Sequence, residues 1–171
     1  MRERDQRRRA RADQLIDEDV LTAPEDYFHA AHLFQHGDLA GDAWKAHTLA
    51  LKSAELGHEK ARWTAAAAYD RWLMYQIRPQ KYGTQYVSDA KRQRLWDVDP
   101  ATSDEERADW DVPPLAEQLR KADQATRSHP PSPRDMQGAP EWLQAALRCW
   151  EREEAEDRAK SPRVPLVEHG S

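Results

Sequence analysis

Apolar residues recur at three- and four-residue spacing along most of this chain, which is the period of an amphipathic helix. The pattern is clearest between residues 41 and 76, where alanines and leucines repeat on both sides of Gly57. Strict alternation of apolar and polar residues, the period of a strand, is almost absent. The pattern therefore predicts an all-α protein that folds as a compact helical bundle.

Proline, glycine and capping residues set the predicted helix ends. Pro24, followed by Glu25 and Asp26, is typical of a helix start, because acidic side chains favour the positive end of the helix dipole. Gly37 and Gly57 are typical helix stops. The predicted helices span residues 2–16, 24–36, 41–57, 59–76, 102–110, 113–126 and 140–160. Residues 79–86 are predicted to form a loop, and the polar segment up to Trp96 has no clear assignment.

The middle of the chain contains one helical hairpin. Residues 45–61 join an alanine-rich helix, a glycine turn and a second alanine-rich helix, which is similar to a tetratricopeptide unit. A solenoid needs at least three such repeats to bury its faces, and only one is visible. We therefore expect the hairpin to lie inside a compact domain. The predicted core residues are Leu51, Trp63, Ala65, Ala68 and Trp72.

A proline-rich stretch divides the chain. The sequence predicts a helical core domain over residues 1–127, a linker over 128–138, a C-terminal helix over 139–160 and a disordered tail over 161–171. The C-terminal helix carries an apolar stripe made of Trp142, Leu143, Ala146, Leu147 and Trp150. An exposed apolar face is costly in water, so we expect this amphipathic helix to pack on the core, form a homodimer or bind a protein partner.

Composition narrows the class of protein. The 171 residues suit one domain, and the single cysteine, Cys149, excludes a disulfide framework, a thiolate zinc cage and a CxxC redox pair. No run approaches the ~18 apolar residues of a membrane span, and the arginine-rich start is followed by no apolar segment, so no secretory signal is predicted. We expect a soluble cytoplasmic protein with no membrane partner and no cofactor.

Charge bears on nucleic-acid binding. Residues 2–11 contain six arginines, which could neutralise phosphates. The formal net charge is nevertheless -5, no second basic stripe exists, and acidic residues follow at positions 13–19. The pattern favours a solvated or salt-bridged helix face, and we expect no nucleic-acid partner.

Three histidines lie on one face of the second predicted helix. His29, His32 and His36 are spaced so that their imidazoles could bind a transition metal, with Asp38 as an added oxygen ligand. A helical metal site usually needs ligands from a second helix as well. The alternative is that His29 and His32 are half-exposed and that His36 is hydrogen-bonded at the helix end. We assign no metal here, although the sequence alone does not decide between the two interpretations.

Asp70 and Arg71 lie deep in the fourth predicted helix, between alanines and Trp72. Charges in such a place are costly unless they are paired. In one interpretation they form separate buried ion pairs that fix the helix register. In the other they form an acidic and anion-holding pair at the base of a pocket.

The most unusual segment is the predicted loop. Gln80, Tyr82, Thr84 and Gln85 gather hydrogen-bonding side chains around Gly83, which can fold the loop tightly. The loop lacks the repeated glycines that cradle phosphates. It could bind a small polar ligand, or it could staple helices together through its side chains, and the sequence leaves both open.

Four short motifs occur in a recognisable order. They are Asp5-Gln6 with Arg9, the segment Gln35 to Asp38, the pair Asp70-Arg71, and the segment Pro79 to Gln85. Over residues 1–115 they resemble a family of uncharacterised bacterial proteins, a domain of unknown function that shares DQ..R, QHxD, DR and PQxYGTQ elements. The resemblance implies a small bacterial helical domain marked by those polar positions, and it implies no particular activity, substrate or cofactor.

Two hypotheses for function follow, and the sequence favours the first of them. In the first, the ends of the second and fourth helices form a polar pocket for a small polar ligand, in which His36 is a general acid or base and Asp70 orients it. The binding residues would be Asp38, Arg71, Gln80, Tyr82, Thr84 and Gln85. Whether such a protein is an enzyme stays open, because no nucleophile, dinucleotide, P-loop or zincin motif is present.

In the second hypothesis the protein is a non-enzymatic interaction module, and a partner binds on exposed helix faces or on the C-terminal stripe. The two hypotheses differ in what a structure should contain. If Asp70, Arg71, Gln80 and Gln85 are fully buried, bonded to one another and without a cavity, the module is favoured.

Overall fold

The structure is a computed structural model that describes residues 2–132 and 138–160. The helices are α1 (Arg2–Asp17), α2 (Pro24–Gln35), α3 (Ala40–Glu55), α4 (Ala61–Tyr75), α5 (Asp104–Ala108), α6 (Leu115–Ser128) and α7 (Glu141–Lys160). The strands are β1 (Tyr86–Ser88) and β2 (Gln93–Leu95). The prediction of a mostly helical protein is confirmed. Residues 133–137 of the predicted linker and the predicted tail, 161–171, lie outside the described residues.

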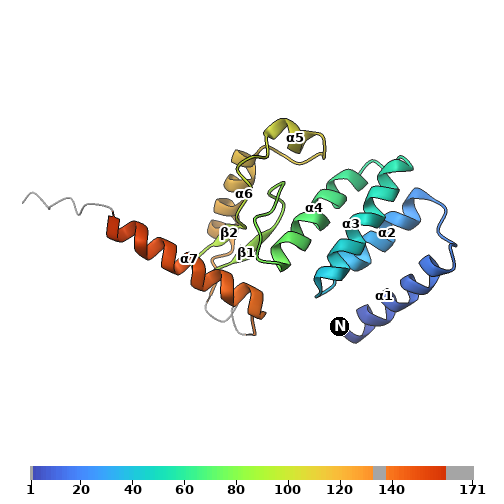
Figure 1. The fold of residues 1–171 in the computed structure, drawn as a ribbon, viewed down its shortest axis with the longest axis horizontal. Coiled ribbons are helices and arrows are strands. Elements are labelled where there is room, and N and C mark those ends of the chain that lie inside the picture. The colour runs from blue at the N-terminus through green and yellow to red at the C-terminus, as the bar shows by residue number, and fades with distance from the viewer. Residues whose placement is uncertain (1, 133–137, 161–171) are drawn as a thin grey trace, which may run out of the picture. The chain divides into compact units, whose positions relative to one another are not determined.

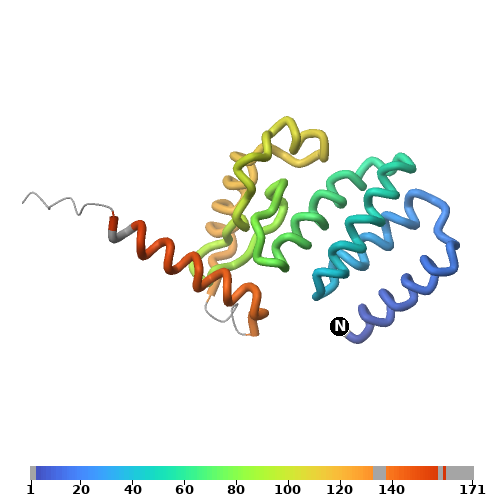
Figure 2. The backbone as a smooth tube through the Cα atoms, viewed as in Figure 1, coloured from blue at the N-terminus to red at the C-terminus, as the bar shows by residue number. Residues whose placement is uncertain are grey.

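The described residues divide into two compact units, residues 2–132 and residues 138–160. In the first unit, α2, α3 and α4 run side by side, with α3 between the other two (Figure 1). The smooth trace of Figure 2 shows the same three helices reversing direction at each short turn. The second unit contains α7, and a partner for its apolar stripe stays a prediction. None of the helices in the described ranges is long and apolar enough to cross a membrane.

The centre of the first unit is built from alanines. Ala65 and Ala68 of α4 are fully buried, as predicted, and they pack with Ala46, Ala50 and Phe34. Side chains this small let helices approach closely while the interior stays densely packed.

Trp63 is a wrong prediction, because it is 39% exposed rather than in the core. Trp63 lies in the first turn of α4, whereas Ala67, one turn further along nearly the same face, is fully buried. Of the other predicted core residues, Leu51 and Trp72 are half-buried. Leu73 and Met74 of α4 are buried, so it is the tryptophans of this helix that lie at the margin of the core.

The short antiparallel sheet departs from the prediction of an all-α fold. Strands β1 and β2 pair with Val87 opposite Arg94, in the segment that had no clear assignment. Each strand has three residues, and β2 is largely polar, so the alternating pattern is too short to stand out. Helix α6 is joined to this hairpin where the Gln93 amide donates to Thr126 Oγ1 at 2.9 Å.

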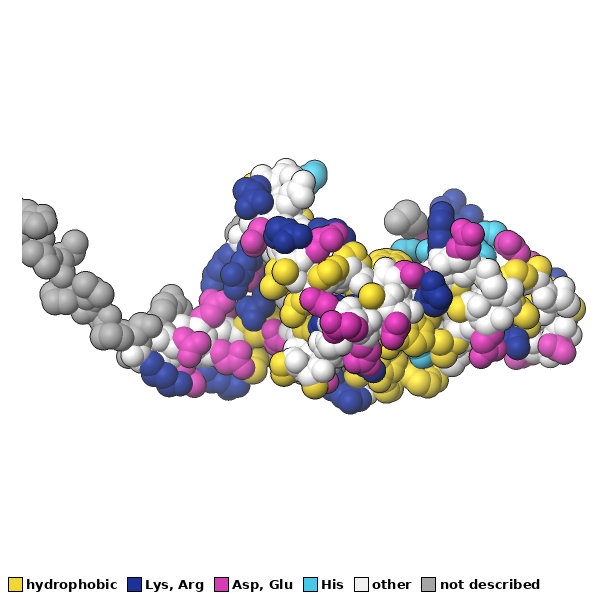
Figure 3. Space-filling model, turned by 90° about the horizontal axis from the view of Figure 1, so that it is seen from above, with side chains coloured by type: hydrophobic (Ala, Val, Ile, Leu, Met, Phe, Trp, Pro, Cys, Tyr) yellow, Lys and Arg dark blue, Asp and Glu magenta, His cyan; other side chains and the backbone are white. Residues whose placement is uncertain are grey.

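Two arginines of α1 pair with acidic residues of the same helix. Arg7 pairs with Glu3, and Arg8 pairs with Asp5. Figure 3 shows positive and negative side chains intermixed over the face in view, with hydrophobic ones between them. These pairs support the interpretation of a salt-bridged helix face, and exposed pairs of this kind add little stability.

Candidate functional site

The carboxylate of Asp70 is fully buried in α4 and accepts four hydrogen bonds from the loop that follows the helix. Its Oδ1 accepts from the amides of Lys81 (2.8 Å) and Tyr82 (2.9 Å). Its Oδ2 accepts from the Thr84 amide (3.0 Å) and from Thr84 Oγ1 (2.8 Å). Gly83 has a φ of +88°, a conformation that glycine adopts at little cost, and it lets the chain curl around the carboxylate.

For Asp70, the interpretation as half of a buried ion pair is wrong, because its hydrogen-bond partners are neutral donors. Burial raises the pKa of the Asp70 carboxyl above its ordinary value, while the hydrogen bonds from Tyr82, Thr84 and Lys81 lower it. Both oxygens face donors only, which is the arrangement that a charged carboxylate needs. The loop supplies through hydrogen bonds what a cation would supply in an ion pair.

Gln80 is also fully buried, and its side chain makes hydrogen bonds to the backbone on the inner side of the same loop. Its Nε2 donates to the backbone oxygens of Gln85 (3.1 Å) and Trp96 (2.8 Å), and its Oε1 accepts from the Gln85 amide (2.8 Å). Its own amide donates to the Asp97 oxygen. The side chain thus holds the loop in shape and fixes it to the segment after β2.

Arg71 and Gln85 extend the network to α2. Arg71 is half-buried; its Nε donates to Gln85 Oε1 (3.0 Å), and its Nη1 donates to the backbone oxygen of Gln35. Gln85 Nε2 donates to the Ala67 oxygen (2.9 Å) and to Thr84 Oγ1 (3.0 Å). A cation at the last carbonyls of α2 satisfies acceptors that have no partner within the helix.

The ends of α2 and α4 lie on the same side of the bundle, since Tyr75 donates from its hydroxyl to the Gly37 oxygen at 3.1 Å. His36 and Asp38 flank Gly37, and both side chains are exposed. Within the described ranges, no hydrogen bond or ion pair joins either side chain to Asp70 or Arg71. Asp38 lies close enough to contribute to the raised pKa of Tyr75, which burial raises most.

Arg107 was missed by the sequence reasoning. It is 2% exposed, its Nε donates to the Tyr82 oxygen (3.0 Å), and its Nη1 donates to the Thr102 oxygen (2.7 Å) and Asp104 Oδ1 (3.1 Å). Its Nη2 is a buried atom without a partner in the described structure. Arg107 lies in a run of charged residues, so nothing in the sequence distinguishes it from a surface arginine.

Histidines of α2 and of the turn before α4 surround the aromatic ring of Phe28. Phe28 stacks on His58 with ring centroids 3.9 Å apart and meets His32 edge-on at 4.6 Å. Burial lowers the pKa of His32, and the neighbouring His36, His29 and His58 lower it further. Within the described ranges, no group of three histidine, cysteine, aspartate or glutamate side chains is placed to hold a metal ion.

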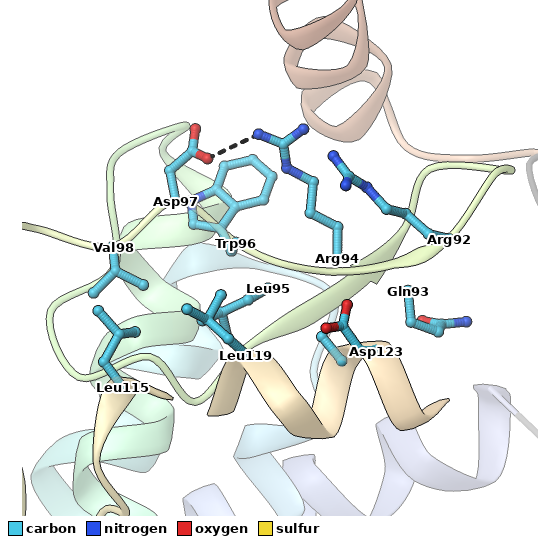
Figure 4. Close-up of a pocket in the computed structure, with 11 residues that line it drawn as sticks. Arg92, Gln93, Arg94, Leu95, Trp96, Asp97, Val98, Leu115, Leu119 and Asp123 are labelled. Carbon is cyan, nitrogen blue, oxygen red and sulfur yellow. Dashed lines mark hydrogen bonds and ion pairs between the residues drawn. The ribbon is translucent and has the colours of Figure 1, made fainter. Parts of the chain in front are cut away.

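Four surface cavities of the first unit have volumes between about 290 and 510 Å³, and none of the four is lined by Asp70, Arg71, Gln80 or Gln85. One of about 500 Å³ lies between β2 and α6. Figure 4 shows Leu115 and Leu119 of α6 beneath β2, and Arg94 on the opposite side of the strand, where it pairs with Asp97.

No protein-family model, curated protein or solved structure matches this chain. The resemblance carried by the four short motifs therefore stays a prediction. Over the ranges that the structure describes, the protein is mostly helical with one short β-hairpin.

The structure brings most of the candidate site residues together as one hydrogen-bonded network. Asp70, Gln80, Thr84 and Gln85 are buried in it, and Tyr82 is buried beside it. The network leaves out the side chains of His36 and Asp38. Of the two interpretations of the loop, the arrangement favours stapling.

We expect Asp70→Asn to lower the free energy of unfolding by about 3 kcal/mol, because the new amide group would face the amides of the loop, donor against donor. Urea unfolding followed by circular dichroism measures the change. The matched control is Asp123→Asn on the exposed surface of α6, which we expect to stay within about 0.5 kcal/mol of the parent. Equal stability of the parent and Asp70→Asn would mean that the loop is not held by this carboxylate.

We expect the protein to lose stability on acidification below about pH 6.5, through His32 and His47. Burial lowers the pKa of both imidazoles in the folded state, so the unfolded chain binds these protons more readily. The raised pKa of Asp70 has the opposite effect on stability, because the folded protein then binds that proton more readily than the unfolded chain. A variant that replaces the two histidines and keeps Asp70 therefore isolates the histidine contribution.

The measurement compares urea unfolding of the parent and of His32→Gln/His47→Gln at about pH 7.5 and about pH 5.5. We expect the parent to lose more of its unfolding free energy between the two conditions than the double variant does. The same loss in both proteins would contradict the assignment to these two histidines.

Proposed function

We propose that this protein is a non-enzymatic helical module that binds another protein. The observation that carries the proposal is the closed network around Asp70. Its hydrogen-bonding groups are used within the protein, so they support a structural role for the residues that would otherwise form a polar pocket.

If the network around Asp70 were a catalytic or ligand-binding site, some of its hydrogen-bonding atoms would have to be available to a ligand. Both Gln80 side-chain atoms are bonded to backbone groups, and Gln85 Oε1 accepts from Arg71. A ligand that competed for them would have to break buried hydrogen bonds and leave their partners unsatisfied, which costs free energy. His36 and Asp38 are exposed beside this network rather than parts of it.

The surface that supports partner binding is the aromatic face, which we define as Trp44 and His47 of α3 with Tyr69 and Trp72 of α4. Trp44 is 43% exposed, and its ring centroid lies 4.8 Å from that of Trp72 and 5.3 Å from that of His47. Tyr69 lies 5.5 Å from Trp72. Rings held against one another lose little freedom on binding, and exposed tryptophan and tyrosine are enriched among the residues that dominate protein interfaces.

The first test separates scaffold from pocket by thermal unfolding of the parent, His36→Ala, Arg71→Ala and Gln85→Ala. The probes are sugar phosphates, dicarboxylates and polar amino acids. We expect Arg71→Ala and Gln85→Ala to melt several degrees below the parent, at about 4 °C per kcal/mol lost. We expect His36→Ala to melt near the parent and no probe to raise the melting temperature of the parent.

A probe that stabilises the parent would overturn the proposal if its effect is lost in Arg71→Ala or Gln85→Ala while the unliganded melting temperatures stay unchanged. That result would mean that these side chains contact a ligand. Stabilisation that persists in both variants would come from a different site.

The second test examines the aromatic face. Proteins captured by the full chain are identified, and their affinities are then measured with purified components for the parent, Trp44→Ala and a matched control. We expect Trp44→Ala to weaken binding of the true partner about tenfold or more. The control is Leu119→Ala, at a similarly exposed apolar side chain on α6, and we expect it to bind as the parent does. Equal affinity of Trp44→Ala and the parent would exclude the aromatic face.

A further inference from the structure

A separate cleft lies on the other side of α4. It has a volume of about 510 Å³ and is formed by α2, by the first turn of α4 and by Asp111, which follows α5. Ligand sites in proteins typically have volumes of about 300 to 1,000 Å³. Phe28, His32, Trp63 and the buried Thr64 line it. Its size therefore suits a ligand of a few tens of atoms.

Aromatic groups set the character of this cleft. Phe28 is half-buried and is held in place by His58, which stacks on it, and by His32 at its edge. Trp63 is 39% exposed and makes no ring contact with another aromatic residue in the described parts of the chain. The cleft thus has one fixed ring and one ring with a free surface, and flat aromatic groups pack favourably against such rings.

The charges around the cleft cancel. Arg62 is neutralised by Asp111, with hydrogen bonds of 2.9 and 3.2 Å from its Nε and Nη2. Glu59 and Lys60 add one negative and one positive charge at the rim. Burial and the neighbouring histidines lower the pKa of His32, which favours its uncharged form. A ligand with net charge would lose water contacts without gaining a counter-charge.

We propose that this cleft binds a small aromatic compound of no net charge, with its ring between Phe28 and Trp63. The site is independent of the module function proposed above, because it shares no residue with the aromatic face. Both the size of the cleft and the balance of its charges point to this class of ligand.

The test uses three indole compounds of similar size. N-acetyltryptophanamide is neutral, N-acetyltryptophan is an anion, and tryptophanamide is a cation at neutral pH. Titrations of the full chain are followed by the NMR amide signals of the protein. We expect the neutral compound to bind with a dissociation constant of about 1 mM or lower. We expect both charged compounds to bind about fivefold more weakly, and we expect the shifted signals to gather at residues 28–32 and 60–64.

Variants locate the ring. We expect Trp63→Ala to weaken binding of N-acetyltryptophanamide about fivefold or more, and Trp63→Phe, which keeps an aromatic wall, to stay within about threefold of the parent. The control is Leu119→Ala, because Leu119 is an exposed apolar side chain on α6 that neither lines the cleft nor belongs to the aromatic face. We expect it to bind as the parent does. Melting temperatures equal to that of the parent establish that each variant is folded.

Three results would overturn the proposal. The neutral compound could shift no signal of the cleft, a charged compound could bind more tightly than the neutral one, or Trp63→Ala could bind as the parent does. A blocked pentapeptide with a central tryptophan tests whether the cleft instead binds an aromatic side chain of another protein. If the peptide binds more tightly than N-acetyltryptophanamide, the cleft holds a side chain of a partner protein instead of a small compound.

Discussion

The buried carboxylate of Asp70 is the constraint on which the arrangement of the first unit depends. It fixes the loop after α4 through three amides and one hydroxyl. Through that loop it places Gln85, which binds Arg71 and so reaches the end of α2, and the Tyr82 carbonyl, which accepts from Arg107. One acidic side chain thereby joins the helical hairpin to the segments that carry the sheet and α5.

This arrangement explains why charged and amide side chains can lie inside so small a core. A buried carboxylate without donors would be costly, and so would a buried loop whose amides lacked acceptors. Each satisfies the other, so removing either leaves its partner unsatisfied. The same reciprocity argues against a ligand at this place, because an added ligand would have to displace hydrogen bonds that are already made. The polar residues that could serve a ligand, such as Asp70, Gln80 and Gln85, are therefore better explained by hydrogen bonds that stabilise the fold.

The sequence predicts the parts of this protein that depend on local pattern. The helices around Pro24 and Gly57 follow from capping chemistry and helical period, and the buried alanines of α4 follow from their spacing. Longer-range features could not be predicted. A hairpin with three residues per strand leaves almost no alternation, and Arg107 has the sequence surroundings of a surface residue. The loop from Gln80 to Gln85 could bind a ligand or staple the fold with the same side chains, and only their partners in space distinguish the two.

The position of Trp63 has a cause that also accounts for both proposed binding surfaces. Helix α4 is buried mainly through alanines, and its aromatic side chains Trp63, Tyr69 and Trp72 remain half-buried or exposed at its margins. Tyr69 and Trp72 lie beside Trp44. Trp63 points about 180 degrees away from Trp72 around the helix axis and lines the cleft with Phe28. A core made of small side chains leaves aromatic area on the surface on two sides of one helix. Because that area is costly to leave in water, it is where binding partners gain the most.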